Sequence, residues 1–505
     1  MDLVISAATA VCEIAGALGV ESYRIDPDGR QWTALGCSDR MPWHPSIRLF
    51  SQPSYGDWDT PLALVGKALK DKALGAADAV EFIRLPHDVE IAVDGSPDDL
   101  STYVLKEQNG WFDPEYEFVL GITQSGMRIV DVGAGIGAYA IPLAKKIADG
   151  KLWAFTQTAA ETNFLMQSRM RNRLEKSVNI AIAGQNLSLD SEMDKHGLDD
   201  IALVRVAVEL SNPDLFAAST RFFSLNSPLV MFGIKPGEVA GIEMANRLMA
   251  HGYGIYRLVP GLNLLVPFIS VEELDAFSLN LFACKPDRAE LLERQGILLR
   301  QLHPLDNLPG IDLKYWQEYL IAMPYAKNRV NEWVNAPQKE QGWEVYWMAL
   351  NLFALAKSAN CSGSERYACM QAAGDVMSTL VQEQANIPRL LTLCRVLTEL
   401  GKREAAVNLL NQICIQLDSG TTLPFDEPFV ALTDAHTLTD PGDRLPEWLV
   451  AMILQQREWL RAFSSFFTGQ ESLPVLEEIQ ASGFGGEAVD RRIMLIRKRF
   501  GAICI

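Results

Sequence analysis

Between residues 86 and 287, strand-like and helix-like patterns of apolar and polar positions alternate along the chain, and together they predict an α/β fold. Short β-branched and aromatic runs indicate strands, whereas apolar residues spaced three or four positions apart indicate helices. The expected strands cover 128–132, 152–156, 178–183, 201–207, 229–234 and 278–284, and the expected helices cover 138–148, 159–173 and about 211–222. Repeated β-α units form a parallel sheet with crossover helices, and a ligand then binds beyond the carboxyl ends of the strands.

The first 85 residues mix helical and strand patterns and predict a small α+β module over 1–85. Residues Leu3 to Leu18 suit a short helix, and Thr60 to Ala73 suit a second one. Between them, Ser22 to Leu35 alternates like a β-hairpin, with Asp-Pro-Asp-Gly at 26–29 as its turn.

Residues 288–505 carry helical periodicity almost throughout, and we expect an all-helical domain there that folds on its own. The segments Pro388 to Leu400 and Arg403 to Leu417, joined at Gly401, form one helix–turn–helix that resembles a tetratricopeptide pair. A solenoid needs about three or more such repeats, and one clear copy is present, so a plain helical bundle is the alternative.

The candidate chemistry lies where the first strand of the α/β region ends. The apolar run Ile129 to Val132 carries Asp131 near its end, and Gly133, Gly135 and Gly137 follow before the next helix. Glycines let a backbone approach a ligand closely, and a helix N-terminus offers free N–H groups. The pattern Asp-x-Gly-x-Gly-x-Gly therefore predicts a nucleotide-type cofactor site. A nicotinamide enzyme and an Asp that only caps the helix are the alternatives.

Composition narrows the class of partner. The net charge of −18 over 505 residues argues against nucleic acid, whose phosphates need a positive footprint, and against docking on anionic lipid. The eight cysteines and six histidines show no metal-ligand spacing, so no metal site is expected. No uncharged stretch is long enough to span a bilayer, and Met1 to Val20 lacks the basic start of a signal peptide. We therefore expect a soluble cytoplasmic protein with reduced thiols.

The glycine pattern resembles the first motif of class I S-adenosylmethionine (SAM) methyltransferases, and further phrases resemble the FkbM-like family of that class. They lie in family order over roughly 98–285: Thr102–Gln108, Trp111–Phe112, Trp153–Phe155, Arg205–Glu209 and Ser227–Phe232. The flanks resemble extended bacterial members with a helical tail. The resemblance implies a Rossmann-like sheet with an antiparallel end near 252–257 and 278–284, SAM as cofactor, and methylation of a hydroxyl oxygen on a glycan or related metabolite.

The chain departs from the family pattern at its acidic positions. The family has an acid after Ala-Phe, where this chain has Thr156 followed by Gln157. The fourth-strand motif has lost its Asp to Ala207 and its Gly to Leu210, and an acid after Met-Phe is replaced by Gly233. We expect Thr156 and Gln157 to stand in for the ribose-binding acid and SAM binding to be weak. An active enzyme with unusual contacts and a degenerate member both remain open.

Two further carboxylates enter the predicted site. Glu209, on the fourth strand, is the candidate catalytic residue that orients or deprotonates an acceptor hydroxyl, and a solvated strand-end Glu is the alternative. Glu107 is expected, by resemblance, to line the methionine end of the cofactor, with an acid on a helix surface as the alternative. Two functions follow: a SAM-dependent O-methyltransferase, and a non-catalytic scaffold whose helical domain binds a protein partner.

Overall fold

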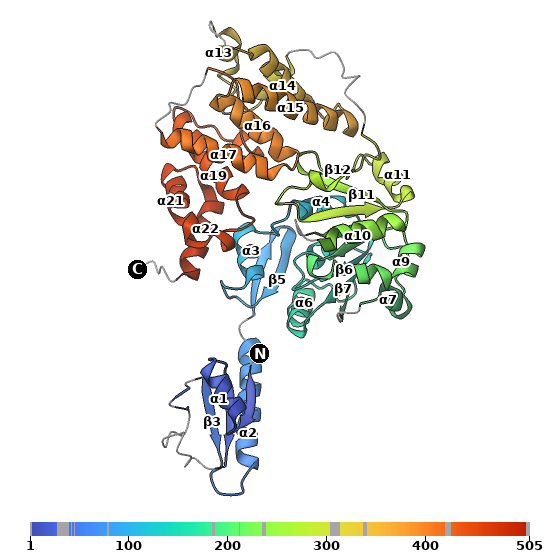
Figure 1. Cartoon of the computed structure of the whole chain (residues 1–505), viewed down its shortest axis with the longest axis vertical. Coiled ribbons are helices and arrows are strands. Elements are labelled where there is room, and N and C mark those ends of the chain that lie inside the picture. The colour runs from blue at the N-terminus through green and yellow to red at the C-terminus, as the bar shows by residue number, and fades with distance from the viewer. Residues whose placement is uncertain are drawn as a thin grey trace. The chain divides into compact units, whose positions relative to one another are not determined.

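The computed structural model describes residues 3–27, 40–41, 43–44, 46–77, 80–183, 187–211, 213–234, 239–302, 314–336, 341–419 and 426–500 (Figure 1). Its internal contacts divide the chain into two compact units, residues 1–81 and 82–505. Among the described residues, every helix is too short or too polar to cross a lipid bilayer.

The N-terminal unit is an α+β module built on three parallel strands. Its elements are β1 Val4–Ala7, α1 Ala10–Ala17, β2 Ser22–Asp26, β3 Ile47–Ser51 and α2 Asp59–Ala77. The strands lie in the order β1-β2-β3. Arg24 on β2 is fully buried and pairs with Asp26 at 2.8 Å and with Glu13 at 3.2 Å.

Two expectations for this module are wrong. The segment expected as one helix over 3–18 begins as the strand β1, because alternate apolar residues at its start pair with β2, and only Ala10–Ala17 is helical. The hairpin expected over 22–35 is excluded because parallel strands already occupy both edges of β2. The expected turn at 26–29 lies partly outside the described residues.

An eight-stranded mixed sheet forms the centre of the second unit, in the order β12-β11-β13-β10-β9-β6-β7-β8. Its strands are β6 Arg128–Val132, β7 Lys151–Thr156, β8 Val178–Ile182, β9 Leu203–Val206, β10 Leu229–Gly233, β11 Gly254–Val259, β12 Leu264–Pro267 and β13 Asn280–Cys284. β6 to β10 pair in parallel, whereas β13 is antiparallel to both β10 and β11. The predicted Rossmann-like sheet with an antiparallel end is confirmed.

Helices cover both faces of the sheet, which explains why the strands read as continuous apolar runs. Ile129 of β6 packs into a core with α4 Pro114–Ile122, α5 Ala140–Lys146 and α6 Ala159–Arg171. Its neighbour Val130 packs into a core on the opposite face. That face is covered by α7 Leu189–His196, α8 Pro213–Ala217, α9 Thr220–Leu225 and α10 Val239–Ala250.

The sequence patterns located the predicted strands to within two residues but missed β12 and several elements around the sheet. The single helix expected near 211–222 is two short helices, α8 and α9. The remaining elements of this half are the hairpin β4 Glu81–Leu85 and β5 Val89–Val93, the helix α3 Leu100–Gln108, and α11 Pro286–Arg294. β5 packs on α6, where the backbone N–H of Ala92 donates to Ser168 Oγ at 2.9 Å.

The described residues after α11 are mostly helical, as predicted. The helices are α12 Tyr315–Ile321, α13 Val330–Asn335, α14 Trp343–Ala356, α15 Gly363–Glu383, α16 Ile387–Glu399, α17 Arg403–Asp418, α18 Asp434–Thr437, α19 Leu445–Leu460, α20 Ser465–Thr468, α21 Leu473–Ser482 and α22 Gly486–Arg499. From α14 to α17, each helix packs on the next (Figure 1). The predicted helix–turn–helix is α16 and α17, and Gly401 between them has a φ of +79°.

The expected boundary between residues 287 and 288 does not separate compact units. Val259 of β11 and Leu264 of β12 belong to the same hydrophobic core as α14 to α17. Gly261, between these strands, packs so closely that a Cβ there would lie 2.5 Å from the Cβ of Glu399 on α16. The helical region is therefore built onto the antiparallel end of the sheet, and residues 82–505 form one unit.

Candidate functional site

The glycine turn lies at the carboxyl end of β6, where the predicted site was placed. Gly133, Gly135 and Gly137 have φ angles of +82°, +52° and +98°. Residues other than glycine rarely adopt positive φ angles. The backbone N–H groups of Gly133 and Ala134 both donate to the carbonyl of Phe155, each at 2.9 Å. The turn is therefore fastened to the neighbouring strand β7.

The three glycines are required for different reasons. A Cβ at Gly133 would lie 2.6 Å from the Cβ of Ala207, and one at Gly137 would lie 2.5 Å from Cδ1 of Leu165. Both are close-packing positions. At Gly135 a Cβ would meet no atom within 4 Å. The centre of the turn therefore faces open space, which a ligand can approach closely.

Asp131 is fully buried beside this turn, and its partner is Arg205 of β9. Nη1 of Arg205 lies 2.8 Å from Oδ1 of Asp131 and donates at 3.2 Å to the carbonyl of Gly133. The guanidinium lies over the Tyr139 ring, 4.1 Å from its centroid. Oδ2 of Asp131 is buried without a hydrogen-bond partner among the described residues. One carboxylate oxygen is thus held by Arg205, and the other is unsatisfied.

A buried polar chain continues from this pair toward the antiparallel end of the sheet. The Tyr139 hydroxyl donates to Oδ1 of Asp113. Nδ2 of Asn280, on β13, donates to Oδ2 of Asp113 at 3.3 Å and to Oε2 of Glu115 at 3.2 Å. Burial, together with the adjacent Asp113, raises the pKa of Glu115 to about 8. Burial also raises the pKa of Asp113.

The predicted ribose-binding residues, Thr156 and Gln157, lie at the carboxyl end of β7. Thr156 is fully buried, and its hydroxyl lies 2.6 Å from the hydroxyl of Thr162 on α6. Gln157 is exposed, and its backbone N–H donates to Glu161 at 2.9 Å. Glu161 also completes a capping box with Thr158 at the start of α6. Its carboxylate therefore caps the helix, while the Thr156 side chain faces the protein interior.

The fourth-strand motif forms a tight contact with the fifth strand. Residues Val208–Leu210 form a short 3-10 helix after β9. A Cβ at Gly233 would lie 2.6 Å from both N and Cα of Val208, so no side chain fits there. The missing acid at position 233 is thus a consequence of close packing. Glu209 lies in the 3-10 helix, and its side chain is outside the described residues.

Glu107 lies in a buried contact between α3 and the C-terminal helices. Its Oε1 lies 3.1 Å from Nε of Arg492 on α22 and accepts from the backbone N–H of Ser465 at 2.8 Å. Glu107 is 2% exposed. Apart from its neighbour Gln108, the partners of this carboxylate are therefore in the helical tail, a contact that the family resemblance did not imply.

Sequence reasoning assigned no role to several residues that join the predicted ones: Tyr139, Asp113, Glu115, Asn280 and Arg205. Arg205 had a readable signal, since a charged residue inside a buried apolar strand needs a partner of opposite charge. The other four residues carried no such sequence signal, because they come together only in the folded chain. No cluster of metal-ligating residues was found among the parts of the chain that the structure describes.

Comparisons with known proteins add a short sequence match and several fold likenesses. No protein-family model matches the chain. Protein FlbA of Caulobacter vibrioides is 37% identical over 73 residues, which is 14% of this chain and 12% of that protein. The chain thus matches a small part of this relative's length.

Solved structures of methyltransferases share the fold of part of this chain at low identity. A SAM-dependent methyltransferase from Aquifex aeolicus is 21% identical, with a TM-score of 0.27, over 37% of this chain and 93% of its own. A SAM-dependent O-methyltransferase from Thermotoga maritima is 18% identical, with a TM-score of 0.26, over 41% and 77%. Fibrillarin from Aeropyrum pernix, solved with SAM bound, is 11% identical, with a TM-score of 0.25, over 34% and 73%.

Proposed function

We propose that residues 82–505 form a SAM-dependent methyltransferase that acts on a hydroxyl oxygen of a glycan or related metabolite. The observation that carries this proposal is the glycine turn. Its central residue, Gly135, faces open space beside a buried acid, Asp131, that has one unsatisfied oxygen. SAM carries an ammonium and a sulfonium, and a nearby carboxylate stabilises positive charge.

The residues present fit one end of SAM better than the other. At the methionine end, the turn supplies an open approach, and Asp131, whose charge is paired with Arg205, supplies a carboxylate with one unsatisfied oxygen. At the ribose end, Thr156 is buried against Thr162, and Gln157 has no charge. A neutral partner contributes about 0.5–1.5 kcal/mol, against about 1.5–3 kcal/mol for a charged one. Weak cofactor binding follows from this loss.

When bound, SAM would supply a methyl group that passes from its sulfonium to the acceptor oxygen, while the hydroxyl proton passes to a carboxylate or to solvent. The chain's contribution is positioning, because the cofactor turn and the acceptor must be held in line. Glu209 remains the proposed acceptor-orienting residue on the strength of its place in the fourth-strand motif.

A second candidate function is a methyltransferase-fold scaffold without catalysis. The observation in its favour is the inward-facing Thr156, which leaves the second strand without a side chain directed at a ribose. The test that separates the two is turnover. Full-length protein is incubated with SAM and neutral oligosaccharides, and S-adenosylhomocysteine is measured. Its formation, dependent on an oligosaccharide, supports the enzyme. SAM binding without turnover on any hydroxyl acceptor supports the scaffold.

A further inference from the structure

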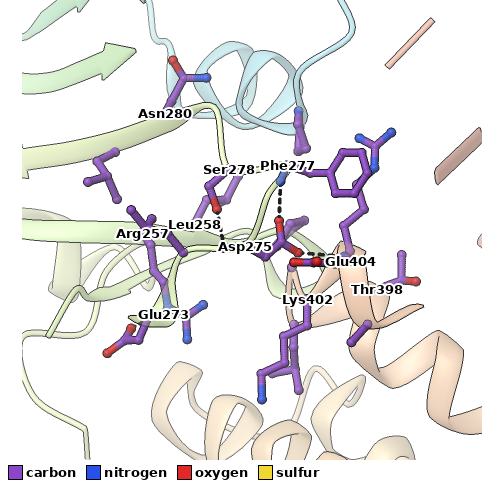
Figure 2. A pocket seen from close by; sticks show the side chains of 18 of the residues that line it. Arg257, Leu258, Glu273, Asp275, Phe277, Ser278, Asn280, Thr398, Lys402 and Glu404 are labelled. Carbon is purple, nitrogen blue, oxygen red and sulfur yellow. Dashed lines mark hydrogen bonds and ion pairs between the residues drawn. The ribbon is translucent and has the colours of Figure 1, made fainter. Parts of the chain in front are cut away.

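A cavity of about 1090 Å³ lies between the antiparallel end of the sheet and the helical tail (Figure 2). β11, β13 and the segment before β13 line one side, and α15, α16 and α17 line the other. We propose that this cavity is the acceptor site and that it takes an uncharged, polyhydroxylated molecule of oligosaccharide size. This inference rests on the proposed function and adds the place and the chemical class of the acceptor.

The cavity is connected to the glycine turn by the buried polar chain. Asn280 and Glu115 both line it, and Asn280 pairs with Gly233 at the carboxyl end of β10. From Asn280, hydrogen bonds lead through Asp113 to Tyr139, whose ring carries the guanidinium that holds Asp131. The cavity therefore opens on the edge of the sheet that carries the turn, the edge where α/β proteins bind ligands.

Contacts between the two sides hold the cavity walls in place. Oδ2 of Asp275 accepts from the backbone N–H of Glu404 at 2.9 Å and so caps α17 from the other wall. Its Oδ1 accepts from the backbone N–H of Phe277 at 2.7 Å, as Figure 2 shows. Nη2 of Arg257 on β11 donates to the Tyr367 hydroxyl on α15 at 3.4 Å. The tail is thus half of the site and is fixed against the sheet.

The charges of the lining favour a neutral acceptor. The acids in it are Glu115, Glu272, Glu273, Asp275 and Glu404, and the cations are Arg257, Lys402 and Arg403. The raised pKa of Glu115 keeps this acid protonated near neutral pH, so the other four acids face three cations. Arg257 pairs with Glu273 at 3.0 Å, and Arg403 donates to the carbonyl of Leu460 at 2.7 Å. An anionic acceptor would meet excess negative charge, which costs affinity.

The remaining polar groups suit hydroxyls. Thr398, Gln371 and Asn408 line the helical side, and Ser278 and Asn280 line the sheet side. Amides and hydroxyls both donate and accept, as sugar hydroxyls do. Single-ligand pockets span about 300–1,000 Å³, so this cavity is slightly larger than that range and has room for several sugar rings.

The test is binding of neutral trisaccharides to the full chain by calorimetry without SAM. The probes are maltotriose, cellotriose, mannotriose and triacetylchitotriose, with trigalacturonate as the anionic counterpart. The blocking variant is Ala368→Trp, which places an indole in the cavity from α15. Its matched control is Thr379→Trp, at an exposed position of the same helix that does not line the cavity. Asn408→Trp repeats the block from α17 if the first variant does not fold.

We expect at least one neutral trisaccharide to bind at millimolar concentration, Ala368→Trp to weaken it about tenfold or more, and Thr379→Trp to leave it unchanged. The inference is overturned if no neutral probe binds, if trigalacturonate binds as tightly, or if the blocking variants bind like wild type. Because SAM is absent, failure of the cofactor proposal does not affect this result. Saccharide binding without SAM binding would leave the cavity as a carbohydrate site and refute the methyltransferase.

Discussion

Asp131 and Arg205 form a buried ion pair at 2.8 Å between the first and fourth strands of the parallel sheet, directly beside the glycine turn. The acid that sequence analysis assigned to the cofactor thus has a protein partner from a neighbouring strand. The pair fixes one oxygen of Asp131 and leaves the other, Oδ2, buried without a partner among the described residues. The ion pair therefore links the two strands and places both of its charges directly beside the turn.

Asp131→Asn removes the charge that balances Arg205. Breaking a buried pair from one side costs about 3–5 kcal/mol, because the remaining charge stays buried. The free energy of unfolding should fall by about that amount in urea denaturation. Asp199→Asn is the matched control, since its pair with Arg128 has a side chain that is 78% exposed and should cost under about 1 kcal/mol. Equal losses for the two variants would mean that the buried Asp131 pair stabilises the fold no more than the exposed Asp199 pair does.

The ribose end of the site can be rebuilt by a double substitution. Thr156→Glu alone would place a carboxylate against Thr162, 2.6 Å from the present hydroxyl, so it should not improve SAM binding. Thr156→Glu with Thr162→Ala removes that obstacle and should tighten SAM by about fivefold to tenfold, the gain of a charged over a neutral hydrogen bond. Thr162→Ala alone is the control. A double variant that binds no better than this control would show that position 156 does not face the ribose.

Glu115 should make stability fall as pH rises. Burial raises the pKa of Glu115 from an ordinary 4.5 to about 8, so the folded state binds more protons than the unfolded state between these values. Stability from this group is therefore full below about pH 4.5 and is lost as pH rises toward 8. Glu115→Gln removes this pH dependence. Between pH 4.5 and about pH 8, the free energy of unfolding of this variant should therefore increase relative to that of wild type. Glu117→Gln, at an exposed position of the same helix, should keep the wild-type slope. Parallel slopes for wild type and Glu115→Gln would contradict the assignment.

Glu107 should matter for the integrity of the whole second unit. Its carboxylate and the Arg492 guanidinium are 1% and 3% exposed, so Glu107→Gln leaves a buried charge and should lower the free energy of unfolding by about 3 kcal/mol or more. Glu487→Gln, which breaks a pair whose acid is 95% exposed, should cost under about 1 kcal/mol. Because the pair joins the sheet region to the tail, both parts should unfold in one transition. A tail that melts separately would restore the expected boundary at 287/288.

Local patterns predicted the strands well because both faces of the sheet are buried, which makes each strand an apolar run that stands out between polar segments. The glycine turn was readable for a related reason, since its φ angles admit few other residues. The packing of the helical tail against the sheet could not be predicted from the sequence. The partner of Glu107 lies at the other end of the chain, and Val259 packs with helices that follow it by about a hundred residues. Periodicity records which residues are buried but not against what.

The same limit applied to the site. Asp113, Tyr139 and Asn280 come from three separate segments and are joined only through hydrogen bonds in the folded chain. The loss of acids at three positions, 233 among them, left a degenerate site open, whereas the structure shows that the backbone of Val208 leaves no room for a side chain at 233.

The measurement that tests the central claim most directly is a calorimetric titration of the full chain with SAM, beside Gly135→Val and Gly126→Val. Both glycines have positive φ, +52° for Gly135 and +82° for Gly126, and open space at the Cβ position, so both variants introduce backbone strain, but only Gly135 lies in the cofactor turn. We predict saturable heat with wild type and with Gly126→Val, and none with Gly135→Val. No heat with wild type at millimolar SAM, or equal binding by all three proteins, would contradict the account.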